Sequence, residues 1–254
     1  MTLPKKPEYF AGIKIDGARE RYFERLERLE RLERERKAKS ESEIKPEITP
    51  ININDFIYVP SANCYLAKQR THLGADWYKT HETLHKENLL MPTIPQFIAY
   101  INYLKANPNG TPSGDATKEE IASILYNILT DRAPWRAEWL DAFFTKQNNQ
   151  LYINYNHRTD SNGNLTPKNS EPLEECLMED DYADVLNGNK QGLPTKKSTK
   201  GKGIYYWHPR ENYVAGFGAG SGRASLGCYL VPSGRYPELG VFSVCEANAM
   251  QRKI

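Results

Sequence analysis

The segment best suited to catalysis is HETLH, which runs from His81 to His85. Two histidines one helical turn apart can hold a zinc ion, and a glutamate between them can act as the base that activates water. The pattern therefore fits a zinc-dependent hydrolase that works through His81, Glu82 and His85. Against this, no third ligand follows at metalloprotease spacing, and no long helix continues from the segment. We expect a chance match at the end of a surface helix and keep the hydrolase as an alternative.

A second candidate is the glycine-rich segment AGFGAGSGRASLGC, residues 215–228. It fits no G-x-G-x-x-G register, no G-K-[ST] follows, and a Pro-Ser-Gly turn stands where a phosphate-binding loop would lead into a helix. A flexible linker is excluded as well, because Phe217 and Leu226 interrupt the small residues. What remains is a period of two, in which glycines alternate with larger residues. This pattern predicts a strand that is packed on one face and bare on the other.

The remaining polar clusters predict neither a metal site nor a cofactor. The acidic run over residues 171–184 does not have the spacing of a calcium loop, and DSNGN at 160–164 is typical of a hairpin turn. The lysine-rich loop over 190–202 lacks the interleaved aromatic residues that bind single-stranded nucleic acid. The four cysteines form no C-x-x-C pair, so we interpret them as mostly buried thiols. We expect no catalytic residue, no metal ion and no cofactor.

The sequence predicts two helices and several short strands in the domain that contains these segments. The first helix follows Thr93 and Pro95, and the second begins with a capping box of Thr117 and Glu120. Alternating apolar residues at 151–155 and the segments IYYWHPR, YVAGFGAGS and LGVFSV predict strands. The buried helix faces are expected to be Phe97, Ile98, Ile101 and Leu104, and Ile121, Ile124, Leu125 and Ile128. The fold class is α+β, in one domain over residues 51–246.

The chain outside this domain is polar and charged. We expect an N-terminal tail over residues 1–15, a charged helix over 16–40, a proline-containing linker over 41–50 and a C-terminal tail over 247–254. In the charged helix, Glu and Arg recur at i+3 and i+4, and three leucines form a narrow apolar stripe. The helix is therefore either a solvated cap or an element for self-association or virion docking.

Bulk composition narrows the function classes. The net charge of +2 gives no argument for binding to nucleic acid or to a membrane surface. No apolar run approaches the length of a membrane span, and the first ten residues lack the apolar stretch of a secretion signal. We expect synthesis in the cytoplasm, no nucleic-acid partner and no membrane insertion.

The C-terminal region has an unusual composition. Residues 212–237 contain no Lys, Glu, Gln, Met or Trp, although these five types supply 55 of the 254 residues. About five or six would be expected in a window of this length. They are also the residue types that no codon ending in a pyrimidine encodes. The types that do appear on the bare face, such as Tyr, Gly, Arg and Ser, can be reached from an asparagine codon by changing its two adenines.

The segments, in their order, resemble a known family. YYWHPRENYVAGFGAGSGRASLGCYLVPSGRYPELGVFSV is similar to the C-terminal variable region of proteins diversified by diversity-generating retroelements, above all those of archaea and archaeal viruses. The likeness extends over INDFIYVPSAN, HETLHKENLLMPTIPQF, APWRAEWLDA, NSEPLEECLMED and NKQGLPTKKS, and so over residues 51–246. It implies a C-type-lectin fold of the formylglycine-generating-enzyme-like type, with an N-terminal charged helix added to it.

The resemblance also implies a function. In that family an error-prone reverse transcriptase rewrites adenines in the variable region, here about 212–244, and the changed side chains form an exposed binding surface. The protein would be a hypervariable ligand-binding protein and not an enzyme. Its ligand would be a surface protein or glycan on a host cell, recognised for virus attachment. The protein would be virion-associated or displayed on a surface.

Two groups of residues follow from the resemblance. The scaffold group comprises Val214, Ala215, Phe217, Ala219, Ala224, Leu226, Cys228, Leu239, Gly240, Val241 and Val244. The ligand-facing group comprises Tyr213, Gly216, Gly218, Gly220, Gly222, Arg223, Ser225, Gly227, Tyr229, Leu230, Val231, Gly234, Arg235 and Tyr236. Since this group is expected to vary, we predict that Tyr, Ser or Asp at Gly216, Gly218, Gly220 or Gly222 leaves stability nearly unchanged. The alternative is a structural virion component whose glycine-rich face packs against another chain.

Overall fold

The computed structural model of the protein describes residues 9–10, 13–14, 51–130, 135–160, 163–220 and 222–247. The chain divides into two compact units, residues 1–48 and 49–254. In the first unit, β1 (Tyr9–Phe10) and β2 (Ile13–Lys14) pair in antiparallel fashion. The predicted charged helix, the linker over 41–50 and the tail beyond residue 247 lie outside the described residues.

Three helices are described in the second unit, and two of them confirm the predictions from sequence. The helix α3 (Ile94–Ala106) begins at Thr93 and α4 (Lys118–Leu129) at Thr117, each with a complete capping box. The reciprocal hydrogen bonds of a capping box satisfy backbone groups that a helix start leaves unpaired. The third helix, α2 (Trp77–Lys86), contains HETLH and starts at Asp76, whose side chain accepts a hydrogen bond from the Lys79 amide.

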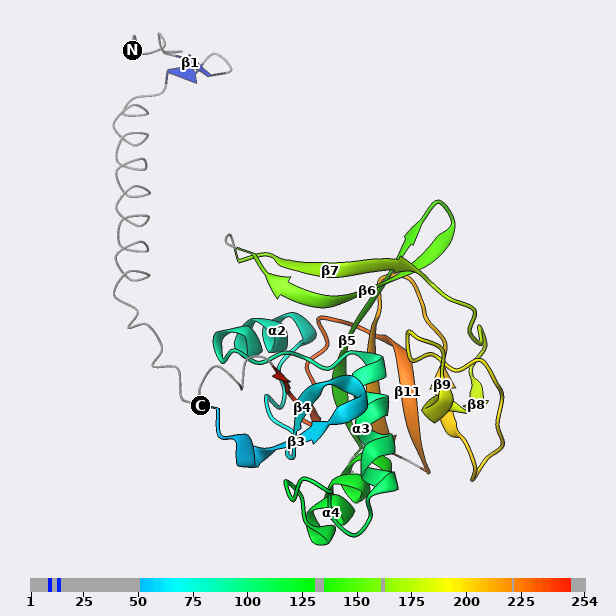
Figure 1. Ribbon diagram of the computed structural model, residues 1–254. Helices are drawn as coiled ribbons and strands as arrows, with labels where there is room; N and C mark the ends of the chain where they lie inside the picture. Colours follow the sequence, from blue (N-terminus) through cyan, green and yellow to red (C-terminus); the bar gives the residue numbers. More distant parts are fainter. Residues whose placement is uncertain are drawn as a thin grey trace. The chain divides into compact units, whose positions relative to one another are not determined.

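An eight-stranded sheet forms the centre of this unit, in the order β7-β6-β5-β10-β11-β9-β8, with β12 beside β5 (Figure 1). The pairs are antiparallel except for β9–β11 and β5–β12. A second sheet has the order β13-β4-β3. The unit is thus α+β, as predicted. Its strands are β3 (Phe56–Val59), β4 (Cys64–Ala67), β5 (Arg136–Gln147), β6 (Gln150–Thr159), β7 (Leu165–Pro172), β8 (Asp181–Ala183), β9 (Ile204–Trp207), β10 (Val214–Gly220), β11 (Arg223–Leu230), β12 (Leu239–Gly240) and β13 (Val244–Glu246), with short 3₁₀ turns at Ile53–Asp55, Pro60–Ala62 and Val185–Asn187.

The central sheet is covered on both faces, and β5 contributes to both cores. On one face, Phe97 of α3 and Ile124 of α4 belong to a core with Leu140 of β5. On the other face, Trp77 of α2 packs with Trp139 in a smaller core. Successive residues of a strand point to opposite faces, so Leu140 and Trp139 enter different cores. Every residue over 136–142 is buried, which explains why β5 shows no alternation of polar and apolar residues.

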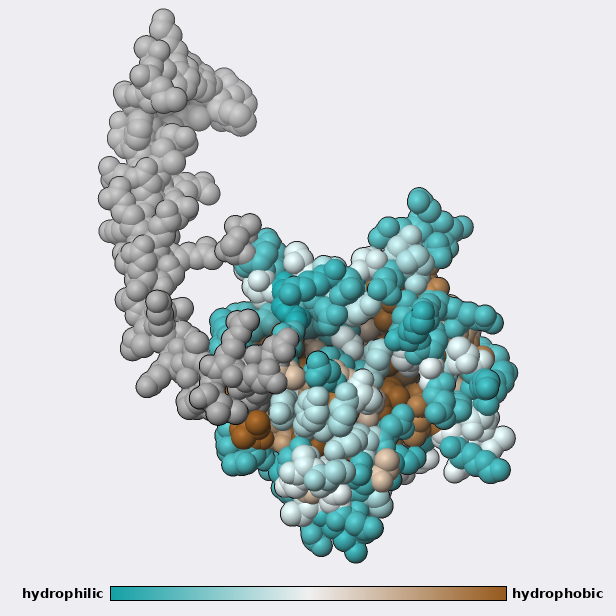
Figure 2. Space-filling model, in the orientation of Figure 1, coloured by the Kyte–Doolittle hydropathy of each residue, from teal (hydrophilic) through white to brown (hydrophobic). Residues whose placement is uncertain are grey.

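The surface is mostly polar, in agreement with the mean hydropathy of −0.70. Figure 2 shows hydrophilic residues over most of the visible surface, interrupted by small hydrophobic areas. In the described part of the chain, every helix is too short or too polar to cross a bilayer.

Candidate ligand-binding face

The glycine-rich segment forms a hairpin of β10 and β11 in the middle of the central sheet. Its register pairs Gly216 with Gly227, Phe217 with Leu226 and Gly218 with Ser225. Directly paired residues point to the same side of a sheet, so the large apolar side chains gather on one side and the glycines on the other. We call the second side the glycine face; it carries Gly216, Gly218, Gly220, Arg223, Ser225, Gly227 and Tyr229.

The opposite side of the hairpin is packed as predicted. Phe217 is fully buried, and its ring lies 5.5 Å from that of Phe97 in α3. Val214 lies on the glycine side, as its even position predicts, and packs there in the smaller core with Trp139. Of the expected scaffold residues, the structure buries Val214, Ala215, Phe217, Ala219, Leu226, Cys228, Leu239, Gly240, Val241 and Val244, and it packs the half-buried Ala224 against the main core.

A row of aromatic rings borders the glycine face along β8, β9 and β11. The ring centroids of Tyr182 and Tyr205 are 5.2 Å apart, those of Tyr205 and Trp207 are 5.1 Å apart, and those of Trp207 and Tyr229 are 4.9 Å apart. The register places them on the glycine side, since Tyr205 pairs with Ser225 and Trp207 with Gly227. All four residues are half-buried. We call them the aromatic ladder.

Prediction from sequence assigned only Tyr229 of this ladder to the site. The other three lie outside the variable region, and nothing local shows that β8 and β9 lie beside β11. One signal is present in the segment Ile204–Trp207, where Tyr206 is fully buried while Tyr205 and Trp207 are not. This alternation predicts that Tyr205 and Trp207 point outward, but it does not predict which strand β9 pairs with.

Two arginines lie against the ladder. The guanidinium of Arg223 lies 3.8 Å from the ring centroid of Tyr205, and that of Arg210 lies 5.4 Å from the ring of Tyr229. Asp180 holds Arg210 in place through a contact of 2.7 Å and also bonds to His208. Burial opposes ionisation of Asp180, but the hydrogen bonds from His208 and the charge of Arg210 outweigh it and lower the pKa of the carboxyl. The arginines are thus cations on aromatic faces, a favourable arrangement for both groups.

The loop after β11 borders the glycine face on the β5 side. The ring of Tyr236 lies 5.6 Å from that of Trp135, and both side chains are exposed. The guanidinium of Arg235 reaches Asp76, the cap of α2, at 2.9 Å. The helix α2 and the loop are also joined by a hydrogen bond from the Trp77 amide to the carbonyl of Pro232. The predicted residues Val231, Gly234, Arg235 and Tyr236 therefore lie in one loop that is fastened to α2.

The glycine face is open at the hairpin tip and closed at its other end. Gly222 is exposed, Gly218 and Gly220 are half-buried, and Gly216 and Gly227 are buried. A Cβ atom placed at either buried glycine would lie 2.9 Å from a methyl carbon of Leu230, so this side chain covers that end. Of the predicted ligand-facing residues, Gly216 and Gly227 are therefore not presented at the surface.

The prediction that the four glycines are free to change without loss of stability is wrong for Gly216, Gly220 and Gly222. A Cβ at Gly216 would lie 2.9 Å from the backbone carbonyl oxygen of Glu138, and one at Gly220 would lie 2.6 Å from the Cβ of Trp135. Contacts this short force neighbouring atoms to move. Gly222 has open space around it but a φ of +95°, which residues with a side chain adopt only under strain. Glycine is required at Gly216 and Gly220 because β5 approaches closely, and at Gly222 because of the backbone conformation of the hairpin turn.

The structure places His81 and Glu82 of the HETLH motif in different environments. His81 is fully buried, so the expectation of a surface helix end is wrong for this residue. Glu82 lies at the surface, where its carboxylate contacts Lys79 at 2.9 Å and Lys86 at 2.7 Å. A metalloprotease-like arrangement needs the glutamate next to the zinc-bound water. Here the glutamate is held by lysines on the solvent side of α2.

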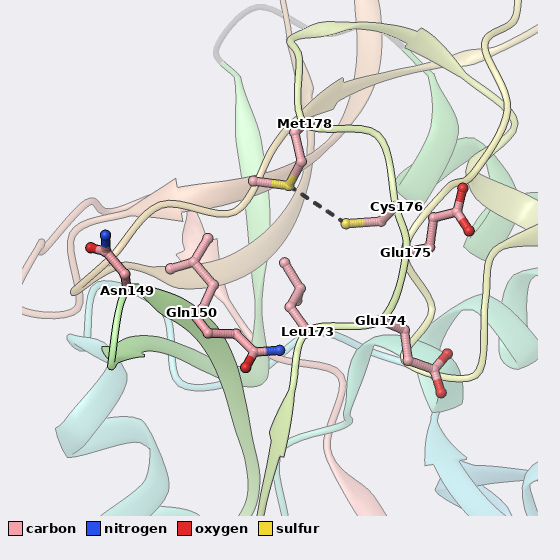
Figure 3. Close-up of a pocket in the computed structure, with 8 residues that line it drawn as sticks. Asn149, Gln150, Leu173, Glu174, Glu175, Cys176 and Met178 are labelled. Carbon is pink, nitrogen blue, oxygen red and sulfur yellow. Dashed lines mark hydrogen bonds between the residues drawn. The ribbon is translucent and has the colours of Figure 1, made fainter.

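One surface hollow, of about 310 Å³, lies away from the glycine face, at the turn between β5 and β6. In Figure 3, Leu173, Gln150 and Met178 surround it, while Glu174 and Glu175 direct their carboxylates outward. The sulfur atoms of Cys176 and Met178 are 3.8 Å apart. Burial raises the pKa of the Cys176 thiol, which disfavours the nucleophilic thiolate. The hollow offers apolar contact and no catalytic arrangement.

Comparison of the chain with protein-family models, with curated proteins and with solved structures finds no match.

Proposed function

We propose that this protein is a non-enzymatic ligand-binding protein and that the glycine face, the aromatic ladder and the loop after β11 together bind its ligand. The observation that carries the proposal is the coincidence of two patterns. Within the compositionally unusual residues 212–237, the non-core members of the β10–β11 hairpin lie on one side of the sheet, and the remaining residues form the loop after β11. A region whose codons are rewritten at adenines would need this separation, because changes on the packed side would unfold the protein. On the glycine side, Gly216, Gly220 and Gly222 are themselves restricted, so the proposed variation falls on the other ligand-facing positions.

The fold that we propose is a C-type-lectin fold of the formylglycine-generating-enzyme-like type. Its support is the resemblance over residues 51–246 together with the α+β architecture and the terminal hairpin. The proposed diversification by an error-prone reverse transcriptase rests on the same resemblance and on the absence of Lys, Glu, Gln, Met and Trp from residues 212–237.

In the proposed mechanism of recognition, the ligand stacks on the aromatic ladder beside the open end of the glycine face. Half-buried aromatic rings supply large, rigid contact area at low conformational-entropy cost, as Tyr and Trp do in antibody paratopes. The glycines at the open end leave room for a ligand to approach the sheet backbone. Trp207 and Tyr229 are braced by their neighbours in the ladder, which makes them the strongest anchors.

The ligand that we propose is a protein or glycan on a host-cell surface, bound for virus attachment. Labelled protein is applied to intact candidate host cells and to an array of immobilised glycans. Trp207→Ala should remove most binding, since truncating a central aromatic anchor costs about 2 kcal/mol or more, a factor of roughly 30 in affinity. Tyr126→Ala is the matched control, because Tyr126 is an exposed aromatic residue on α4, which packs against the opposite side of the sheet. Equal loss in both variants, or no loss in Trp207→Ala, contradicts the assignment of the face.

The diversification is tested separately, on DNA. A near-identical repeat beside a reverse-transcriptase gene, differing from codons 213–237 only at adenines, is the expected result. If such a repeat is absent, the proposal of diversification fails while the binding face remains open to the cell and glycan experiment.

A further inference from the structure

Three ligand-type side chains meet inside the second unit, on the α2 side of the central sheet. His81 comes from α2, Asp141 from β5 and His157 from β6. Their exposed fractions are 0%, 2% and 5%, and one ligand atom from each lies within 4.8 Å of those of the other two. Residues 16 to 76 positions apart in the chain are thus brought to one buried point.

The separation between His81 and Asp141 suits a coordinated metal ion, whereas His157 and Asp141 are joined by a hydrogen bond that a bound ion would replace. His81 Nε2 lies 3.6 Å from Asp141 Oδ1. With zinc-to-ligand distances near 2.0–2.2 Å, the ligand atoms of a tetrahedral site lie about 3.4 Å apart. His157 Nδ1 contacts the same carboxylate oxygen, and the His157 amide donates to Asp141 Oδ2 at 2.9 Å. The carboxylate is therefore oriented by the backbone of its neighbour, as metal-binding carboxylates commonly are.

The unpaired ring nitrogens of His81 independently indicate a bound ion. Both of its ring nitrogens are buried, and neither has a hydrogen-bond partner. Leaving a buried polar group unpaired costs about 1–3 kcal/mol, so such a residue calls for an explanation. Since no hydrogen-bond partner occupies either ring nitrogen, a lone pair of His81 is available to a metal ion. A neutral imidazole is the form that binds metal ions.

The surroundings hold these rings in place. The ring of Trp77 packs edge-on against His81 at 4.3 Å and against His157 at 4.9 Å. Trp77 is itself fixed by a hydrogen bond from its Nε1 to the carbonyl of Leu140. In β6, Asn156 has a φ of +54°, and the β5–β6 pairing extends only to Phe143 and Asn154. The distorted backbone at Asn156 directs the next side chain, His157, toward Asp141.

We propose that His81, Asp141 and His157 bind one divalent cation of the zinc type. Two imidazoles and a carboxylate are ligands that zinc accepts, and water completes the tetrahedron. The site is structural, because its ligands are buried and the only adjacent base of the HETLH motif, Glu82, is held by lysines at the surface. The ion links α2 to the β5–β6 hairpin, and α2 in turn holds Pro232 and Arg235 of the proposed binding face.

This ligand set differs from the one that the HETLH motif predicts. That motif would use His85, but His85 Nδ1 lies 2.6 Å from the hydroxyl of Thr159, and the ring centroids of His81 and His85 are 5.7 Å apart. The proposed site instead takes one ligand from each of three elements. His85 is therefore a matched control on the same helix.

The experiment uses the full chain without a histidine tag, stripped with a chelator and titrated with Zn²⁺ and with Co²⁺. The expected result is one ion per chain, visible absorption bands of tetrahedral Co²⁺, and a melting temperature that rises with zinc. His81→Gln and His157→Gln should each weaken zinc binding by more than about tenfold. His85→Gln should bind zinc as the unmodified protein does, and so should His72→Gln, which changes a half-buried histidine outside the proposed site.

Several results would overturn the proposal. One is a stripped protein that takes up no stoichiometric zinc or cobalt, a measurement that does not depend on any variant. Another is undiminished zinc binding by His81→Gln, provided that circular dichroism shows it folded. A third is loss of binding in His85→Gln, which would restore the motif-based ligand pair. Octahedral cobalt bands would exclude the tetrahedral site.

Discussion

The two glycines at the closed end of the glycine face should respond differently to the same substitution. At Gly216, a Cβ atom meets the backbone oxygen of Glu138 at 2.9 Å as well as the Leu230 side chain. At Gly227, the near atoms all belong to side chains, namely Leu230 at 2.9 Å and the ring of Tyr229 at 3.1 Å. A side chain can rotate away, whereas the carbonyl is held in the β5–β10 ladder. Only Gly216 is therefore blocked by something that cannot move.

The magnitudes follow from two opposing contributions. Overpacking costs about 1–3 kcal/mol, and replacing a strand glycine by alanine recovers about 0.5–1 kcal/mol. Gly216→Ala should lower the free energy of unfolding by about 1–2 kcal/mol, while the contributions at Gly227 should cancel to within about 1 kcal/mol. In a Leu230→Ala background, Gly227→Ala should become stabilising by about 0.5–1 kcal/mol. Gly216→Ala should remain destabilising there, because the carbonyl contact persists.

The assay is urea unfolding followed by tryptophan fluorescence, for the single variants and both double variants. A coupling energy above about 0.5 kcal/mol between Gly227 and Leu230 is expected. The reasoning is refuted if Gly216→Ala is as stable as the unmodified protein, or if Leu230→Ala rescues it completely. Either outcome would mean that β5 and β10 can move apart without cost.

Other substitutions test the packing, the hairpin turn and a buried carboxyl, all by urea unfolding. Phe217→Ala should lose about 3–5 kcal/mol, because the ring is fully buried; a loss below about 1 kcal/mol would contradict its place in the core. Gly222→Ala should lose about 1–2 kcal/mol from its φ of +95°, although its surroundings are open, and an unchanged stability would show that the turn can rearrange. Glu138 is buried, and burial raises its pKa from 4.5 to about 8 against the opposing charges of Arg70 and Arg136. The folded protein holds the Glu138 proton more tightly than the unfolded protein does. The protonated carboxyl therefore contributes its full share of stability below pH 4.5, and this share is lost as the pH rises to about 8. Glu138→Gln should therefore remove this decline and gain stability relative to the unmodified protein on the order of a few kcal/mol at pH 8; parallel pH profiles would show that Glu138 is already ionised at pH 5.

Local sequence patterns were sufficient to predict several secondary-structure elements. Thr117 and Glu120 predicted the start of α4, and the spacing of Phe97, Ile101 and Leu104 predicted the buried side of α3. These features are short-range, because a capping box and an apolar stripe are complete within one or two helical turns. The second core escaped prediction, since Trp77 and Trp139 belong to segments that nothing local joins.

The two-sided character of the β10–β11 hairpin follows from local sequence alone, because a period of two assigns each residue to a side whatever the strand pairs with. The packing of remote strands sets which residues border the bare side and how much room a substitution has there. It brought β8 and β9 next to β11, and so placed Tyr205 and Trp207 beside the glycines. It also brought β5 close enough that Gly216 has no room for a Cβ, and it joined His81 to Asp141 and His157 inside the protein. These are contacts between remote segments, and their distances depend on how the whole sheet is assembled.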